Sequence, residues 1–323
     1  MSQRPAGAES PRPRIVWTTL FVLVALGGAG LAVAADRPHN PVHRPELTVR
    51  ADQRAQPWID ALGAELALIA TDIGDLSAGG RDVLAGLQSL DLTATDAALA
   101  DGDALAEQTD AAADDLISLR TGAHAEIEEW RLGSATVEQL ASIDAATASA
   151  QRVSTYWQGL AAHARPVSGL VATLLCHDGT VFRATTAGRQ AAWDDALGLL
   201  DEAARHLAAA DAVRDELAAS GINVETLSDL LGRYRAYDEA LVALYTYARD
   251  TGEQSGDTFA ALQAAVDEAQ AALPADNRAA LTVIVGEAAG PSVTMALVDI
   301  EAAHGSINEA IDAITPDEPQ TTP

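Results

Sequence analysis

Three consecutive residues, Cys176, His177 and Asp178, have the types of a nucleophile, a base and a carboxylate that orients the base. In a catalytic relay of this kind the side chains converge from distant positions, because adjacent residues do not face one another. We therefore interpret the segment as a small buried thiol followed by a turn, without a catalytic role. Cys176 is the single cysteine of the chain, so no intrachain disulfide can form.

Acid and histidine pairs at helical spacing are the next candidates, because they can ligate a metal ion. Glu301 and His304 have the Glu-x-x-His spacing of di-metal helical bundles, but such a centre needs a second copy of this motif, and the sequence has none. His39 and His43 lie in a proline-rich stretch and are expected to be solvated. The acidic clusters lack the 12-residue loop of an EF-hand. The sequence predicts no metal site and no cofactor.

Four of the five tyrosines fall in one predicted helix, residues 224–249. Tyrosine and arginine are favoured at binding hot spots, so this helix carries the best candidate for an interaction surface. The candidate residues are Arg233, Tyr234, Tyr237, Tyr245 and Tyr247. The structural interpretation is nevertheless favoured, because a tyrosine at the edge of a core buries its ring and leaves its hydroxyl in water.

The sequence carries none of the reaction motifs that would identify an enzyme. There is no Walker loop, no G-x-S-x-G, no H-E-x-x-H and no dinucleotide-binding fingerprint. The formal net charge is −27, and every basic residue is an arginine. A chain this acidic repels the phosphate backbone, so we exclude nucleic acid as a partner. We expect a protein that is not an enzyme.

The segment that organises the chain is residues 15–35, which are 21 residues without a charge. Roughly 20 apolar residues cross a bilayer core, so this segment predicts a single transmembrane helix that contacts the lipid bilayer. Arg12 and Arg14 abut its N-terminal end. Arginines next to a span stay on the cytoplasmic side, so we expect the large C-terminal part outside the cytoplasm.

Two further interpretations of this segment stay open. Residues 32–34 read Ala-Val-Ala, which fits a signal-peptidase site, and cleavage there would give a secreted protein. Gly28 and Ala32 have the small-xxx-small spacing that lets two membrane helices approach closely. The span is therefore compatible with a homo-oligomer.

The rest of the chain has the apolar periodicity of helices, so the predicted fold class is all-α. The first long helix, residues 58–90, carries a heptad stripe typical of a coiled-coil-like bundle. The stripe consists of Ile59, Leu62, Leu66, Ile69, Ile73, Leu76, Val83, Leu87 and Leu90. Further helices are expected at 94–132, 136–163, 190–219, 224–249, 258–273, 276–288 and 292–314. Short connections make consecutive long helices antiparallel, which predicts an elongated bundle.

Proline, glycine and polar residues divide the chain into parts. The predicted order is an N-terminal tail (1–14), a transmembrane helix (15–35), a proline-rich juxtamembrane linker (36–57), a first segment of three long helices (58–165), an irregular connection (166–189), a second helical segment (190–314) and a disordered tail (315–323). Prolines favour an extended spacer in the linker. Turn-forming residues interrupt the connection.

These features favour a membrane-anchored, extracytoplasmic helical bundle as the leading hypothesis. It would act as a non-enzymatic interaction, scaffold or sensor-like module of the cell envelope, with a protein partner there. The alternative is an extracytoplasmic helical domain that binds a small ligand or a metal. The span, the spacer, the heptad stripe and the missing reaction motifs motivate the first hypothesis.

Overall fold

The structure, a computed structural model, describes residues 45–315 of the chain, with side chains from residue 47. Within this range there are eight α-helices and one short 3-10 helix, 91% of the residues are helical, and there is no strand. The prediction of an all-α fold is therefore confirmed for the described residues.

The helices follow one another with short connections. Their bounds are α2 Pro45–Ser89, α3 Leu92–Glu126, η1 Glu129–Arg131, α4 Ser134–Arg189, α5 Trp193–Ala219, α6 Glu225–Thr251, α7 Asp257–Ala272, α8 Asn277–Ala288 and α9 Gly290–Ile314. The longest is α4, with 56 residues. At 1.5 Å per residue this helix is roughly 80 Å long, so it can belong to two separate packing units.

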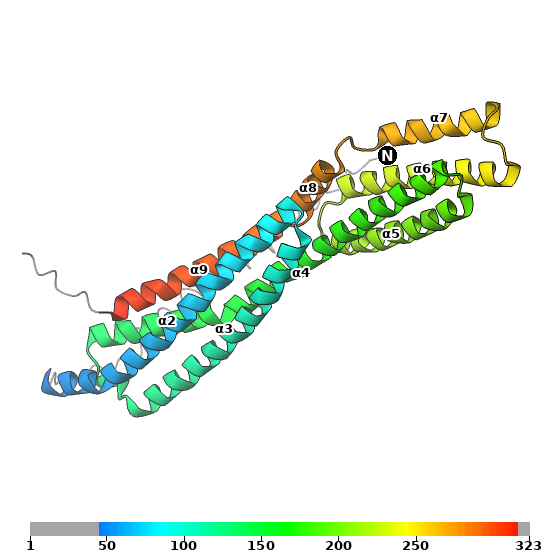
Figure 1. Cartoon of the computed structure of the whole chain (residues 1–323). Coiled ribbons are helices and arrows are strands. Elements are labelled where there is room, and N and C mark those ends of the chain that lie inside the picture. Colours follow the sequence, from blue (N-terminus) through cyan, green and yellow to red (C-terminus); the bar gives the residue numbers. More distant parts are fainter. Residues whose placement is uncertain (1–44, 316–323) are drawn as a thin grey trace, which may run out of the picture.

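Two helical bundles share α4 (Figure 1). The first bundle consists of α2, α3, the N-terminal half of α4, α8 and α9. The second bundle consists of the C-terminal half of α4 with α5, α6 and α7. Each bundle has its own cluster of buried apolar side chains, and the first also takes in the neighbouring ends of α5 and α6. The molecule is consequently elongated along α4.

The heptad stripe of the first long helix forms the centre of the first bundle. Its nine members are all buried, seven of them at 0% exposure, with Ile59 at 1% and Leu90 at 9%. They pack where α2 faces α3, α4 and α9. The spacing predicted this burial correctly, because residues three and four apart fall on the same face of a helix.

The linker predicted at residues 36–57 is wrong over its described part, because α2 begins at Pro45. Proline is tolerated at the first position of a helix, where its missing N–H would have no partner. Pro57 lies inside α2 and removes one backbone hydrogen bond. Asp52, one turn earlier, accepts a hydrogen bond from the backbone amide of Gly133 at 2.9 Å, which holds this part of α2 against the start of α4. Tertiary packing thus overrides the local preference.

The irregular connection predicted at residues 166–189 is also wrong, because α4 continues through it to Arg189. Pro166 lies inside the helix, and the expected end at residue 163 does not occur. The reason is that one face of this stretch stays buried at helical spacing. The buried residues on this face are Val167, Leu170, Val171, Leu174, His177 and Val181.

Trp157 of α4 is the largest fully buried side chain of the first bundle, and a glycine of α3 makes room for it. A methyl group at Gly102 would lie 1.9 Å from Trp157 Cζ2. The indole nitrogen donates a hydrogen bond to Asp103 at 2.9 Å, which fixes the ring. The close approach of α3 and α4 therefore depends on Gly102.

We expect Gly102→Ala to lower the free energy of unfolding by about 1–3 kcal/mol, the usual cost of overpacking a core. Gly169→Ala on α4 is the matched control, because its added methyl group meets nothing within 4 Å. The control should be stabilised by about 0.5–1 kcal/mol through higher helix propensity. Urea unfolding of both full-length variants measures the difference. Equal stability of the two variants would contradict the packing of Trp157.

The predicted tail (1–14) and transmembrane helix (15–35) lie outside the described residues, as do residues 36–44 and 316–323. Among the described helices, α4 has the length and apolar composition to cross a membrane, and 44% of its most apolar window is buried. The pair α8 and α9 passes the same test together, with a bend of 52° between the two. Both are also core helices of the first bundle.

Candidate functional site

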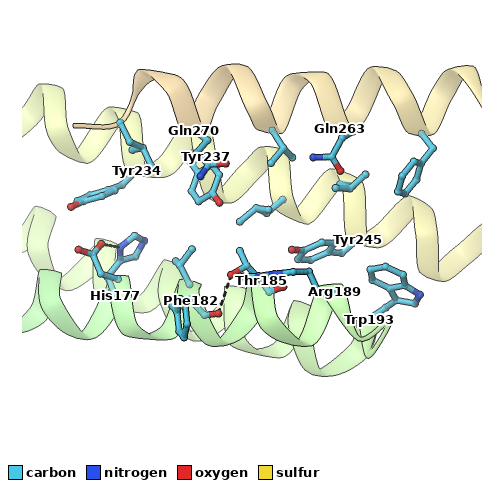
Figure 2. Close-up of a pocket in the computed structure, with 18 of the residues that line it drawn as sticks. His177, Phe182, Thr185, Arg189, Trp193, Tyr234, Tyr237, Tyr245, Gln263 and Gln270 are labelled. Atoms are coloured by element: carbon cyan, nitrogen blue, oxygen red, sulfur yellow. Dashed lines mark hydrogen bonds and ion pairs between the residues drawn. The ribbon is translucent and has the colours of Figure 1, made fainter. Parts of the chain in front are cut away.

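A cavity of about 670 Å³ lies between α4, α6 and α7 in the second bundle and is partly open to solvent (Figure 2). Its volume is within the range of small-molecule sites. Its aromatic lining includes Trp193, Tyr234, Tyr237, Tyr245 and Phe259. Its polar lining includes His177, Asp178, Thr185, Arg189, Gln254, Gln263, Gln270 and Asn277. Apolar rings with a few polar groups are the usual chemistry of a binding site.

The cavity exists because α7 packs on α6 and stands apart from α4. α6 is the helix with which α7 makes its main contact. Val266 is the one buried residue of α7, although the helix has 16 residues. In the rest of the second bundle α4 packs against α5 and α5 packs against α6, so the open space lies between α4, α6 and α7 (Figure 2).

The connections on either side of α7 are suited to movement. Gly252 and Gly256 precede it with φ angles of 69° and 102°, a region that glycine adopts without strain. Pro274 follows it in the connection to α8. A helix with one buried side chain between such connections opens at low free energy. We infer that α7 is the movable wall of the cavity.

Amide hydrogen exchange is expected to be faster in α7 than in α5 and α6 of the same bundle. Local opening of α7 exposes Val266 and the partly buried Phe259, Leu262 and Ala269, whereas α5 and α6 bury six and ten residues. Exchange of the full-length protein, followed by mass spectrometry at peptide resolution, measures this difference. Equal protection of α6 and α7 would show that α7 is a fixed part of the bundle.

His177 lies at one end of the cavity, 1% exposed, between two carboxylates. Its Nε2 is 2.9 Å from Asp238 Oδ2 on α6, and its Nδ1 is 3.3 Å from Asp178 Oδ1. Asp178 Oδ2 also accepts a hydrogen bond from Asn277 at the start of α8, at 3.0 Å. This network joins α4, α6 and α8 where the two bundles meet.

The two carboxylates hold His177 in its charged form. Burial alone lowers the pKa of a histidine, because it disfavours the charged ring. Here the hydrogen bonds and charges of Asp178 and Asp238 outweigh burial and raise the pKa of His177 to about 9. The ring is an imidazolium at neutral pH and donates from both nitrogens. It is therefore a buried cation held between two carboxylates.

Tyr234 stands over this network, with its ring centroid 4.8 Å from that of His177. Burial raises the pKa of Tyr234 well above its usual value, and the charge of Asp178 adds to the effect. The phenol is consequently neutral. Its hydroxyl is buried and has no hydrogen-bond partner among the described residues, and the same holds for Asp238 Oδ1. Such unpartnered groups are rare in a folded interior.

The predicted interaction residues of α6 fall into two groups. Tyr234, Tyr237 and Tyr245 are buried and line the cavity. Tyr247 lies outside it, and its hydroxyl donates a hydrogen bond to Glu253 at 2.7 Å. Arg233 is exposed and donates to the last carbonyl of α7, that of Ala272, at 3.2 Å. The structure therefore brings three of the five residues together, inside the protein and not on an exposed surface.

A glycine of α4 sets the position of the Tyr245 ring. A methyl group at Gly188 would lie 2.4 Å from Tyr245 Cζ, so the helix backbone forms the wall under this ring. Trp193, the first residue of α5, packs against the same ring with centroids 5.6 Å apart. Tyr245 and Trp193 close the cavity at the end away from His177 (Figure 2).

The other candidates from the sequence do not form reactive sites. Cys176 is exposed and α4 continues past it, so the prediction of a buried thiol followed by a turn is wrong, whereas His177 turns into the core and contacts its neighbour Asp178. Glu301 accepts a hydrogen bond from Ser77, and His304 lies beside Gly74 of α2. Within residues 45–315, no three acid, histidine or cysteine side chains are placed to share a metal ion.

The pairing of His177 with Asp238 was not predicted from the sequence. One signal was present, because His177 continues the apolar spacing of Leu170 and Leu174 and therefore falls on the buried face of α4. A histidine on such a face needs a partner. The partner itself, 61 residues away on α6, follows from helix packing.

Three comparisons with known proteins were made: with models of protein families, with curated proteins and with solved structures. None of the three found a match.

Proposed function

We propose that this protein is a membrane-anchored module that binds a small molecule in the cavity between α4, α6 and α7. Residues 15–35 would hold it in the cell membrane, with the helical bundles outside the cytoplasm. The observation that carries the proposal is the cavity of about 670 Å³ with its aromatic lining. Binding there would make the protein a sensor-like module of the cell envelope rather than an enzyme.

The cavity favours ligand binding over a purely scaffolding role. Tyr234, Tyr237 and Tyr245 are buried and line the cavity, so they give a ligand an aromatic wall to contact. A ligand in the cavity would bury its own apolar surface against these rings, which stabilises by about 25 cal/mol per Å². The sequence placed an interaction or scaffold role first, and the cavity supports its ligand-binding alternative.

The anchoring rests on the sequence. Residues 15–35 carry no charge and are long enough for one crossing. Arg12 and Arg14 support an orientation with the N-terminus inside. Because α7 is the movable wall of the cavity, a ligand that holds it against α4 would change the exposed surface of the second bundle. A partner protein in the envelope would recognise this change in the surface of the second bundle.

Filling the cavity tests this function. Thr185 and Thr186 of α4 both donate a hydrogen bond to the carbonyl of Phe182 at 2.9 Å, but only Thr185 lines the cavity. Thr185→Trp should therefore occupy the site, and Thr186→Trp is its matched control. The wild type and both variants, full length in detergent, are screened against a small-molecule library by thermal shift.

Compounds that raise the Tm of the wild type are expected to act on Thr186→Trp and to have no effect on Thr185→Trp. A ligand at 100 times its Kd stabilises the folded state by about 2.7 kcal/mol, which is easily measured. Ligands that stabilise all three proteins equally would contradict a small-molecule site in this cavity. A screen that finds no stabilising compound for the wild type would also contradict it.

A further inference from the structure

We propose that the ligand is an organic monoamine, with its ammonium group beside Asp178 and Tyr234 and an aromatic or aliphatic body along the tyrosines of α6. The inference rests on the proposed function and adds the chemical class of the ligand. It depends on the charges at the His177 end of the cavity, on an unpartnered hydroxyl there, and on the position of the one arginine in the lining.

The His177 end of the cavity carries an excess of negative charge. Asp178 and Asp238 both face His177, so two carboxylates share one imidazolium. Asp238 is buried, whereas the side chain of Asp178 is 25% exposed and lines the cavity. Each carboxylate oxygen accepts more than one hydrogen bond. Asp178 can thus accept from a ligand while it holds His177 and Asn277.

The hydroxyl of Tyr234 is the second group that supports an amine as the ligand. It is buried, borders the cavity and makes no hydrogen bond of good geometry among residues 45–315, although Asp178 lies near enough to raise its pKa. Figure 2 shows Tyr234 and His177 facing each other at the same end. A neutral phenol offers lone pairs as well as one proton. An ammonium group placed between Tyr234 and Asp178 would donate to both.

The middle of the cavity suits the body of such a ligand. Tyr237 lies between Tyr234 at the His177 end and Tyr245 at the Trp193 end in Figure 2, and Leu241 and Leu244 complete the wall formed by α6. The faces of tyrosine rings carry negative potential, which favours a cation nearby as well as apolar contact. The apolar body of a ligand would therefore be covered by these tyrosine rings.

Arg189 limits the ligand to one positive charge. Its guanidinium donates to the carbonyl of Thr185 at 3.3 Å, and Figure 2 shows it between the His177 and Trp193 ends. A second ammonium group in the body of the ligand would meet this cation. A polyamine is disfavoured for that reason, while a monoamine avoids the repulsion. The net charge of −27 on the whole chain also attracts small cations to the protein.

Three compounds of one shape test the charge preference: 4-phenylbutylamine, 4-phenylbutan-1-ol and 4-phenylbutyrate. They differ only in a positive, neutral or negative end. Calorimetric titration of the full-length protein in an uncharged detergent, with detergent-only titrations subtracted, should give the tightest binding for the amine. The alcohol should bind about tenfold more weakly, because it loses a charge-assisted hydrogen bond, and the acid should bind weakest.

Two variants locate the ammonium group. Asp178→Asn should weaken binding of the amine about tenfold or more, and Tyr234→Phe should weaken it by roughly three- to tenfold. Asp201→Asn on α5 is the control, because it changes net charge equally at an exposed site away from the cavity. Circular dichroism checks the fold of each variant. If Asp178→Asn does not fold, Tyr234→Phe alone tests the position of the ammonium group.

The amine assignment is overturned if the acid or the alcohol binds as tightly as the amine, if none of the three binds, or if Asp201→Asn weakens the amine as much as Asp178→Asn. The proposed function fails in a different way, when binding to the wild type persists in Thr185→Trp. An acid or alcohol that binds the wild type but not Thr185→Trp would keep the cavity as a binding site and reject an amine as its ligand.

Discussion

Replacing His177 by leucine is expected to lower the free energy of unfolding by about 3–5 kcal/mol, the usual effect of removing one partner from a buried ion pair. Asp238, 5% exposed, would then keep a carboxylate in the interior, because its Oδ2 loses the imidazolium and its Oδ1 has no partner among the described residues. Repulsion from Asp178 would add to the loss. Urea unfolding at pH 7 measures this change.

Two controls separate the ion pair from simple loss of packing. The double variant His177→Leu with Asp238→Leu removes both charges and should recover part of the stability, because no buried charge is left unpaired. His206→Leu on α5 tests a partly exposed histidine, 3.9 Å from Glu202, and should change stability by less than about 1 kcal/mol. A double variant that is less stable than His177→Leu would contradict this account of the network.

Stability is also expected to fall as the pH rises from 6.5 to 9. The pKa of His177 is raised from 6.5 to about 9 in the folded protein, so the folded state binds the proton more tightly than the unfolded state. Its contribution is fully present below pH 6.5 and is lost as the pH passes through 9. The full contribution is on the order of 3 kcal/mol.

Urea unfolding at pH 6, 7, 8 and 9 measures this dependence. The buried tyrosines Tyr234, Tyr237 and Tyr245 also have raised pKa values, mainly through burial. Their effect has the same sign, but it begins only near pH 10, where an unfolded tyrosine ionises. The double variant without His177 and Asp238 should lack the slope between pH 6.5 and 9. A wild type whose stability rises over this range would contradict a protonated His177.

Helix identity could be predicted from the sequence because apolar spacing is a local property. The stripe from Ile59 to Leu90 is buried as its period requires. Helix ends were harder, because Pro57 and Pro166 are signals for breaks that packing overrides. A proline removes one backbone hydrogen bond, whereas the buried face of α4 continues for several further turns. The outcome depends on contacts between helices that a single segment does not contain.

The candidate site was predictable only in part, for a similar reason. Tyr234, Tyr237 and Tyr245 share a face of one helix, so their spacing identified them as a group. Their burial around a cavity depends on α7 standing apart from α4. The contact between His177 and Asp238 depends on the register of α4 against α6. Neither the cavity nor the ion pair has a signature at fixed sequence spacing.

Native mass spectrometry of the full-length protein, purified from the cells that make it, tests the central claim most directly. The wild type and Thr186→Trp are expected to carry a small molecule that leaves on gentle activation, and Thr185→Trp is expected to appear at its bare mass. Wild-type protein without any adduct, or the same adduct on Thr185→Trp, would contradict a small-molecule site between α4, α6 and α7.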